Sequence, residues 1–435
     1  MNILRINHKQ ILERLKKSKL FKDSFWAVFG NGMGNAMLLV AGILIARLLG
    51  KDLYGEYGVV KTTMFHIAAF STFGLGYTST KFIAQYIKEN PTYLRAITKA
   101  ALKITLLSSG LLCILLLVFA NQLAEYVNDP HLATPFRFLG VIVITRALST
   151  VCSGTISGYK KFKEQGINNI ISGTAMLVLA PTLTYLWGLN GSLVALLSSQ
   201  LILTLLNFKI LWNIFRILPD SDNISFTRRL FVFSIPVAMQ EFTYALSHWG
   251  GTLILAKYAS IGEVGIYSAS GQWNTIIRYI PALLSSVVLS YLSSSITNKE
   301  HNSMMFRMII INLACISVPF IIVLVCSGWI TSMYGPTFNG MQSVLIVLIF
   351  CTVISVVARV FQNELISRGR NWLMFSLRSG KDLLTIGGLF VILKYYAPHS
   401  PALSYAIVDV VANIFFLTAL VLSYMLSQKR ESINS

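Results

Sequence analysis

Long apolar stretches alternate with short polar connectors along the whole chain. A transmembrane helix needs about 20 mostly apolar residues to cross a hydrocarbon core roughly 30 Å thick. The pattern therefore predicts an all-α polytopic membrane protein with twelve transmembrane helices. The twelve windows lie near 24–46, 58–79, 103–120, 135–157, 167–187, 191–212, 230–254, 266–292, 308–332, 341–361, 373–396 and 402–426.

The eleventh window is the least apolar, because Arg378, Lys381 and Asp382 occupy its first turns. Charged side chains are costly in hydrocarbon, so we expect these three to stay close to the headgroups. Two pairs of glycines four residues apart predict close contacts between helices. These pairs are Gly30 with Gly34, and Gly154 with Gly158.

The two halves of the chain carry related connectors. An offset of 210 residues aligns the connector after the first window with the one after the seventh, so that Ala46, Arg47, Gly55 and Tyr57 meet Ala256, Lys257, Gly265 and Tyr267. The same offset aligns the exits of the fourth and tenth windows, where Ile156, Ser157, Lys160 and Phe162 meet Ile366, Ser367, Arg370 and Trp372. The repeat predicts two parallel six-helix lobes, 1–215 and 216–435, with a binding site between them near the membrane midplane.

Positive charge is distributed unevenly between the connectors. If Met1 lies inside, 27 of the 36 Lys and Arg fall in inner segments, and only five fall in the outer connectors. Cytoplasmic loops carry an excess of Lys and Arg. Both termini are therefore expected to face the cytoplasm, which agrees with an even number of spans.

Composition excludes several classes of protein. The chain is 54% hydrophobic and 12% charged with a mean hydropathy of +0.65, far from a soluble enzyme. The net charge of +19 is scattered over seven short segments, so nucleic acid is not an expected partner. All five cysteines lie in apolar windows without metal-ligand spacing, and no disulfide framework or metal site is expected. No nucleotide-binding or hydrolase motif is present, so we expect no cofactor and no enzymatic activity.

Six ionisable residues fall inside apolar windows. Each costs roughly 2.5 to 3.5 kcal/mol on insertion scales, so each should face the bundle interior or a wet cavity. Helical spacing gives the arginines polar companions; Arg146, for example, shares a face with Ser153 and Ser157. The six residues are Lys61, Arg146, Glu241, Arg278, Arg359 and Asp409.

Four cations against two carboxylates predict a lumen that suits an anionic headgroup. Guanidinium groups bind phosphate oxygens through paired hydrogen bonds, so a diphosphate path is one interpretation. The other is that each arginine pairs with a carboxylate or with helix-end carbonyls and only holds helices together. The candidate path consists of Arg146, Arg278, Arg359, Lys61, Asn31, Asn35 and Asn274.

Carboxylates in the windows are candidates for coupling transport to an ion gradient. Glu241 and His248 lie on one face of the seventh window, and Asp409 lies in the twelfth. A buried carboxylate can exchange a proton or a cation as a cavity opens and closes. The alternative is a satisfied internal hydrogen bond, and the coupling ion, H⁺ or Na⁺, stays open.

Five motifs in order resemble the multidrug/oligosaccharidyl-lipid/polysaccharide exporter superfamily, and within it the O-antigen flippases of the Wzx kind. The motifs are Ala46-Arg47-Leu48-Leu49-Gly50, Tyr54-Gly55-Glu56-Tyr57-Gly58, Gly74-Leu75-Gly76 before Lys81-Phe82-Ile83-Ala84, Gly158-Tyr159-Lys160-Lys161-Phe162, and Val264-Gly265-Ile266-Tyr267-Ser268-Ala269. The family often has an Asp-Arg pair at the second-lobe connector, whereas this chain has Ala256-Lys257.

The resemblance implies a MATE-like fold with two six-helix lobes around a V-shaped cavity. It also implies a flippase for lipopolysaccharide biosynthesis in the bacterial inner membrane. Such a protein moves an undecaprenyl-diphosphate-linked O-antigen repeat unit from the cytoplasmic to the periplasmic leaflet by alternating access. A polysaccharide polymerase and a chain-length regulator are its implied protein partners.

Other functions stay open at this point. A flippase for lipid II or a teichoic-acid precursor fits a cationic lumen equally well. A multidrug or cation antiporter of the same superfamily would need a lumen dominated by carboxylates and aromatic residues. A membrane glycosyltransferase would need a large outer loop with catalytic acids, and the outer connectors here are short.

Overall fold

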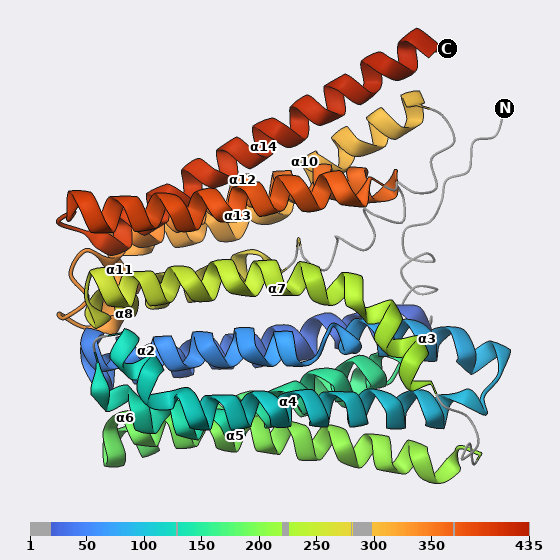
Figure 1. The fold of residues 1–435 in the computed structure, drawn as a ribbon, viewed down its shortest axis with the longest axis horizontal. Helices are drawn as coiled ribbons and strands as arrows, with labels where there is room; N and C mark the ends of the chain where they lie inside the picture. The colour runs from blue at the N-terminus through green and yellow to red at the C-terminus, as the bar shows by residue number, and fades with distance from the viewer. Residues whose placement is uncertain are drawn as a thin grey trace, which may run out of the picture.

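The computed structural model describes residues 19–127, 129–219, 226–279, 281, 298–368 and 370–434. Within these ranges the chain forms helices joined by short turns, with no β-strand (Figure 1). The helices are α2 (Lys19–Ser71), α3 (Leu75–Glu89), α4 (Tyr93–Tyr126), η1 (Pro130–Leu132), α5 (Ala133–Gly158), α6 (Phe162–Ile217), α7 (Thr227–Tyr258), α8 (Ile261–Ile277), α10 (Asn298–Val325), α11 (Ser327–Tyr334), α12 (Met341–Ser367), α13 (Asn371–Val391), η2 (Ile392–Tyr396) and α14 (Pro401–Asn434).

Seven helices in the described ranges are long and apolar enough to cross a membrane. They lie in α2, α4, α5, α6, α10, α12 and α14. The chain is therefore a multi-pass membrane protein, as the hydrophobic pattern predicted.

Two of these helices are much longer than a bilayer requires. α2 has 53 residues and contains a break at Gly50, where φ is 71° and ψ is 175°. α6 has 56 residues and contains a break at Gly188, where φ is 56° and ψ is −133°. Glycine adopts positive φ without the steric cost that a Cβ imposes. Each break falls between two predicted windows, so each long helix consists of two arms.

The second predicted window, 58–79, is not one continuous helix. α2 ends at Ser71, and α3 begins at Leu75 after Phe73 (φ 47°) and Gly74 (φ 69°). The hydroxyl groups of Ser71 and Thr72 donate to carbonyl groups of the last turn of α2, at 2.7 and 2.8 Å. Such local hydrogen bonds compete with helix continuation. The prediction of an unbroken span here was wrong.

Two charged residues of the eleventh window pair with each other. Asp382 is the twelfth residue of α13, which has 21 residues, and its exposed fraction is 3%. The Nζ atom of Lys381 lies 3.1 Å from Asp382 Oδ1. Pairing allows a carboxylate to be buried, and the position of these residues near the headgroups stays a prediction.

The glycine pairs mediate close helix crossings, as predicted. A Cβ atom on Gly30 of α2 would overlap the backbone of Gly166 in α6, and Gly34 makes a similar contact one turn later. A Cβ atom on Gly154 of α5 would overlap the backbone of Gly76 in α3. Small residues let helix backbones approach closely inside a membrane.

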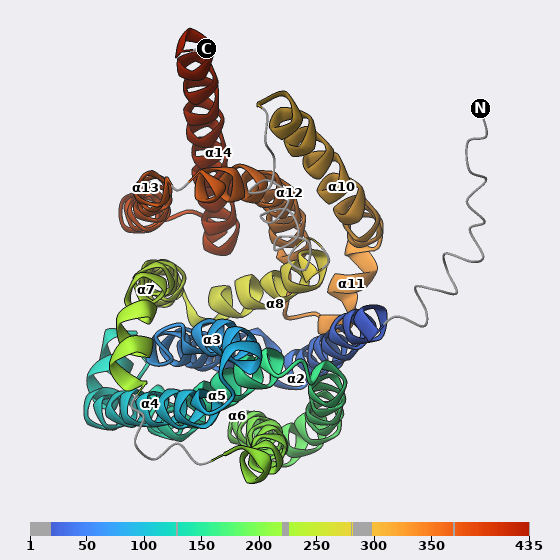
Figure 2. The same cartoon turned by 90° about the vertical axis from the view of Figure 1, so that its right-hand side faces the viewer.

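α7 packs against both halves of the chain (Figure 2). Its first half lies on α3, where Thr78 Oγ1 and Ser234 Oγ are 2.9 Å apart. Its last turn lies on α13, where the rings of Tyr258 and Phe390 meet edge to face at 5.5 Å. The boundary at residues 215 and 216 stays a prediction, and α7 bridges the two units that it would separate.

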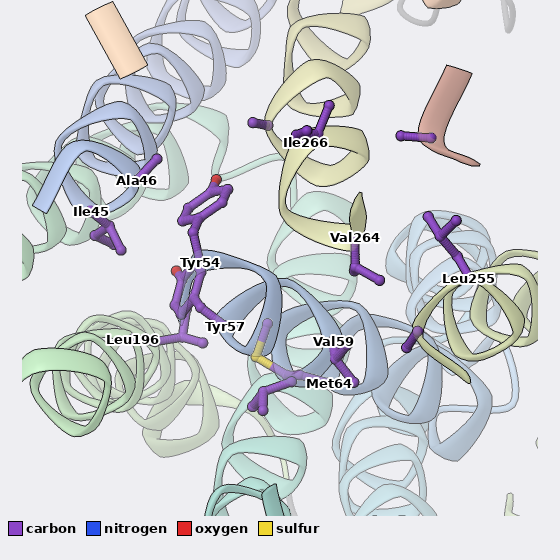
Figure 3. Close-up of a cluster of buried hydrophobic side chains, with 14 of the residues drawn as sticks. Ile45, Ala46, Tyr54, Tyr57, Val59, Met64, Leu196, Leu255, Val264 and Ile266 are labelled. Carbon is purple, nitrogen blue, oxygen red and sulfur yellow. The ribbon is translucent and has the colours of Figure 1, made fainter. Parts of the chain in front are cut away.

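One end of the bundle, here called the connector end, holds Gly50, Ser260 and the short helix α11. Beside it lies a buried core in which Tyr54 and Tyr57 are 2% and 1% exposed (Figure 3). α8 contributes Val264 to this core, which has no exposed surface. Burial of large aromatic rings dominates the packing energy of such a core, so α2 and α8 are joined firmly at the connector end.

The predicted repeat has a structural counterpart at the exits of α5 and α12. The residues before the next helices, Lys161 and Arg370, adopt nearly the same φ and ψ, −88° and 49° against −84° and 47°. The N–H groups of both bond carbonyls five residues earlier, those of Ile156 and Leu365. These turns correspond at an offset of 209, one less than the sequence alignment placed them.

Candidate functional site

A cavity of about 500 Å³ lies among four helices of the second half of the chain. α7, α8, α12 and α14 contribute all of its lining except Arg278, Tyr279 and Pro281, which follow α8 in the chain. The sequence predicted a site shared by both halves, whereas no residue of α2 to α6 lines this cavity. The lining residues are Tyr244, His248, Tyr267, Gly271, Asn274, Thr275, Arg278, Tyr279, Pro281, Leu348, Ser355, Val356, Arg359 and Asp409.

Arg278 follows the last residue of α8 and lines the cavity. Its Nη2 atom donates to Ser355 Oγ at 3.3 Å. Its Nε atom is buried and has no hydrogen-bond partner among the described residues. A buried unpaired donor is costly, so this guanidinium is well suited to an anion that enters the cavity.

Arg359 lines the same cavity from α12, one turn after Ser355. In the described part of the chain, salt bridges join Lys161 to Glu164, Arg368 to Glu364 and Lys381 to Asp382. None of these involves Arg278 or Arg359. The cavity therefore brings two predicted arginines together, and no described salt bridge pairs either of them with a carboxylate.

Asp409 of α14 is 9% exposed and belongs to a polar network. Its Oδ1 accepts a hydrogen bond from Asn413 Nδ2 at 3.0 Å, and its Oδ2 accepts one from Cys351 Sγ at 3.3 Å. Asn413 Oδ1 accepts a hydrogen bond from Ser355 Oγ at 3.1 Å. Ser355 Oγ in turn accepts a hydrogen bond from Arg278. The network thus connects the buried carboxylate to the cationic wall of the cavity.

Aromatic rings form another part of the lining. Tyr267 is stacked on Tyr405, with ring centroids 4.2 Å apart and planes 7° apart. The rings of Tyr244 and His248 lie 4.4 Å apart, and the guanidinium of Arg378 lies 5.1 Å from the Tyr244 ring. No binding role was predicted for the tyrosines from the sequence, although Tyr267 lies in the motif Val264-Gly265-Ile266-Tyr267-Ser268-Ala269.

His248 also meets the first half of the chain. Its ring is nearly parallel to that of His66 in α2, with centroids 6.0 Å apart. One residue later, Trp249 Nε1 donates to Thr63 Oγ1 at 3.0 Å. Glu241 lies in α7, but its side chain lies outside the described part of the structure.

Two predicted cations lie away from the cavity. Arg146 packs over the Phe65 ring at 4.7 Å and donates to Gln200 Oε1 at 3.4 Å, both within the first half. The Nζ atom of Lys61 lies 5.6 Å from the centre of the Tyr57 ring. Neither residue lines the cavity that holds Arg278.

The polar face of α5 points toward α6. The sequence had predicted that this face would point toward a common lumen. Ser153 Oγ accepts from Asn207 at 3.0 Å, and Ser157 Oγ donates to Gln165 at 2.9 Å. Asn31 of α2 likewise accepts a hydrogen bond from the Asn169 side chain of α6. Asn35, one turn after Asn31, does not line the cavity. Helical periodicity identified the polar faces but could not identify the neighbouring helix.

The remaining predicted binding residue, Asn274, does line the cavity. Its Oδ1 atom lies 2.9 Å from Thr352 Oγ1. Together with the arginines, the tyrosines and Asp409, it gives one pocket donors for an anion and acceptors for hydroxyl groups. Such a pocket can accept a polar or anionic ligand inside a helical bundle that crosses the membrane.

Comparison with solved structures identifies the fold. The inward-facing conformation of a multidrug resistance MATE family transporter of the MOP superfamily matches with a TM-score of 0.78 and 14% identity, over 92% of this chain and 95% of that chain. An outward-facing conformation of such a transporter gives a TM-score of 0.65 and 15% identity, over 97% of this chain and 98% of that chain. The lipid II flippase MurJ in an inward closed conformation gives a TM-score of 0.70 and 16% identity, over 93% of this chain and 87% of that chain. The fold is therefore MATE-like.

The family follows from the sequence. Residues 44–342, more than half of the chain, match the model of the family described as "Polysaccharide biosynthesis protein". The chain belongs to this family. A search of curated proteins found no match.

Proposed function

We propose that the protein flips an undecaprenyl-diphosphate-linked oligosaccharide, an O-antigen repeat unit, from the cytoplasmic to the periplasmic leaflet of a bacterial inner membrane. The unpartnered Nε of Arg278, buried in a cavity beside Arg359, carries the proposal. A diphosphate supplies acceptors for these donors and replaces the water that it loses on entry. Membership of a polysaccharide biosynthesis family supports a saccharide cargo.

The proposed topology has twelve spans with both termini in the cytoplasm. The breaks at Gly50 and Gly188 divide α2 and α6 into two crossing arms each. The connector end then faces the periplasm. The excess of Lys and Arg in the inner segments supports this orientation.

The sugar occupies the part of the cavity beside Tyr267 and Asp409. Aromatic faces pack against the C–H bonds of a pyranose ring, and carboxylate and amide oxygens accept hydrogen bonds from its hydroxyl groups. The rigid pair that Tyr267 forms with Tyr405 supports this placement. The diphosphate occupies the arginine side, near Arg278.

Transport is coupled to a gradient of H⁺ or Na⁺ through Asp409, with His248 and Glu241 as further candidates. The network from Asp409 through Asn413 and Ser355 to Arg278 supports coupling. A change in the charge of Asp409 alters the potential at the diphosphate site. A polysaccharide polymerase and a chain-length regulator would act on the flipped product.

A flippase for lipid II or a teichoic-acid precursor is the second candidate. The same arginines would bind its diphosphate, and the fold is shared with the lipid II flippase MurJ. A multidrug or cation antiporter fits less well, since Arg278 and Arg359 repel a cation.

The proposal is tested by the sidedness of labelled lipid-linked saccharide in cells with and without the gene. We expect the oligosaccharide-bearing lipid to accumulate on the cytoplasmic leaflet after deletion and to return to the outer leaflet on complementation. Accumulation of lipid II alone would establish the second candidate. Unchanged sidedness of every lipid-linked saccharide, with increased sensitivity to drugs, would establish the antiporter.

A further inference from the structure

Two helices of the first half carry lysine and arginine on exposed sides at the same end of the bundle. On α6, Lys209, Trp212 and Arg216 are exposed and are spaced by three and four residues, so they share one side of the helix. On α4, Lys99 and Lys103 are exposed and lie one turn apart. α4 begins and α6 ends at the end of the bundle opposite the connector end (Figure 1). The ends of membrane-spanning helices lie at the level of the lipid headgroups, so these cations lie there too.

The two helices are neighbours at this end. The guanidinium of Arg95 in α4 lies 5.8 Å from the centre of the Phe215 ring in α6. Leu102 of α4 and Ile214 of α6 pack against one buried cluster, which includes Ile156 of α5. The two exposed sides therefore border one surface, here called the basic surface, which consists of Lys99, Lys103, Lys209, Trp212 and Arg216.

The charge of the basic surface is not balanced by acidic residues on the helices that carry it. Neither the stretch 93–103 of α4 nor the stretch 205–217 of α6 contains Asp or Glu. None of the salt bridges in the described part of the chain involves Lys103, Lys209 or Arg216. A local excess of positive charge attracts anionic groups. The basic surface is therefore suited to an anion.

Apolar side chains continue both exposed sides toward the middle of the membrane. Leu205 lies one turn before Lys209 on α6, and Leu106 continues the exposed side of α4; both leucines are exposed. Trp212 is 53% exposed, and the guanidinium of Arg216 lies 5.9 Å from the centre of its ring. Tryptophan is typical of the boundary between headgroups and hydrocarbon. Cations followed by an aromatic ring and then by leucines match the charged head and the acyl chains of a lipid.

We propose that the basic surface binds an anionic phospholipid, whose phosphate lies among the cations and whose acyl chains lie along Leu205 and Leu106. A soluble phosphate would contact the cations and leave the leucines uncovered. Both α4 and α6 pack against α5, so a lipid that contacts both stabilises this end of the three helices. In the proposed topology the lipid belongs to the cytoplasmic leaflet. The inference goes beyond the proposed function and does not depend on it, because no cargo takes part.

Titration of the purified protein with single phospholipids in detergent tests the site. Native mass spectrometry measures how much phosphatidylglycerol or phosphatidylcholine is bound, and we expect phosphatidylglycerol to bind the wild type more tightly. Each Lys or Arg near an anionic lipid surface strengthens binding about 5-fold. Arg216→Gln should therefore weaken binding of phosphatidylglycerol about 5-fold, and Lys209→Gln combined with Arg216→Gln should weaken it about 25-fold. Binding of phosphatidylcholine should not change.

Arg307→Gln is the matched control, since Arg307 of α10 is also exposed and lies outside the basic surface. It removes the same charge and should leave binding of phosphatidylglycerol at the wild-type level. An equal loss for Arg307→Gln would show an effect of net charge alone and would overturn the site. Equal affinity of the wild type for the two phospholipids would overturn it as well. Melting temperatures of the lipid-free variants confirm that each is folded.

Competition identifies the source of the phosphate. Inorganic phosphate should not displace phosphatidylglycerol at equal concentration, because it has no acyl chains; displacement would show a plain anion site and contradict the proposal. Phosphatidylglycerol should also stay bound in the presence of equimolar undecaprenyl diphosphate. Its complete displacement would show a docking site for the carrier of the proposed cargo and would overturn the phospholipid. Because none of these measurements includes transport, the lipid site and the proposed function can fail separately.

Discussion

In the proposed function, Arg278 and Tyr267 divide the cavity between recognition of the diphosphate and recognition of the sugar. The Nε atom of Arg278 has no described partner, so an incoming anion gains a hydrogen bond without breaking one. Tyr267 is held against Tyr405, so its ring is positioned before any ligand arrives. Such preorganisation reduces the entropic cost of binding.

Substitution of Tyr267 should affect the sugar and spare the diphosphate. Aromatic contacts contribute about 0.5–1.5 kcal/mol, so Tyr267→Leu should weaken binding of the saccharide-bearing carrier by roughly 2- to 12-fold. Binding of the carrier diphosphate without sugar should be unchanged. Tyr267→Phe keeps the ring and serves as the matched control. Equal losses for both ligands would show that Tyr267 is structural and not a sugar contact.

Periodicity in the sequence was sufficient to find part of this site. The polar faces around Arg278, Arg359 and Asp409 do meet at one cavity. Arg146 was indistinguishable from them by spacing, yet its face meets Gln200 of α6. A helical pattern specifies which face is polar, whereas the neighbour depends on packing between distant segments.

Breaks within long helices give the bundle its connectors. The break at Gly188 has φ 56° and ψ −133°, a region that residues with a Cβ rarely adopt. The apolar windows predicted this break because a polar connector separates them. The break at Phe73 was missed, since no charged residue or proline interrupts the window there.

Gly188→Ala should destabilise the protein through its backbone alone. A Cβ atom there meets nothing within 4 Å, so the cost is conformational, about 1–2 kcal/mol. Gly110→Ala is the matched control, because this helical glycine also has free space and should gain about 0.5–1 kcal/mol. Thermal unfolding in detergent measures both. A melting temperature for Gly188→Ala at or above that of the wild type would contradict the break.

The chain as a whole carries an internal repeat whose two copies touch at the connector end. The repeat was visible in the sequence, and Gly58 lies against Ser268, the residue 210 positions later. The cavity in the second half was not foreseen, because a symmetric repeat predicts a site between equal lobes. The copies have diverged, since Arg278 of the cavity corresponds to Ala68 in the first copy.

Flipping of labelled undecaprenyl-diphosphate oligosaccharide in proteoliposomes tests the central claim most directly. Arg278→Gln should slow flipping by at least about 10-fold, which corresponds to roughly 1.4 kcal/mol and is modest for a hydrogen bond to a charged group. Arg278→Lys should retain part of the rate, since charge remains without the paired donors. The control Arg137→Gln changes an exposed arginine of α5 and should match the wild type. Flipping at the wild-type rate by folded Arg278→Gln protein would contradict a cationic site for the diphosphate.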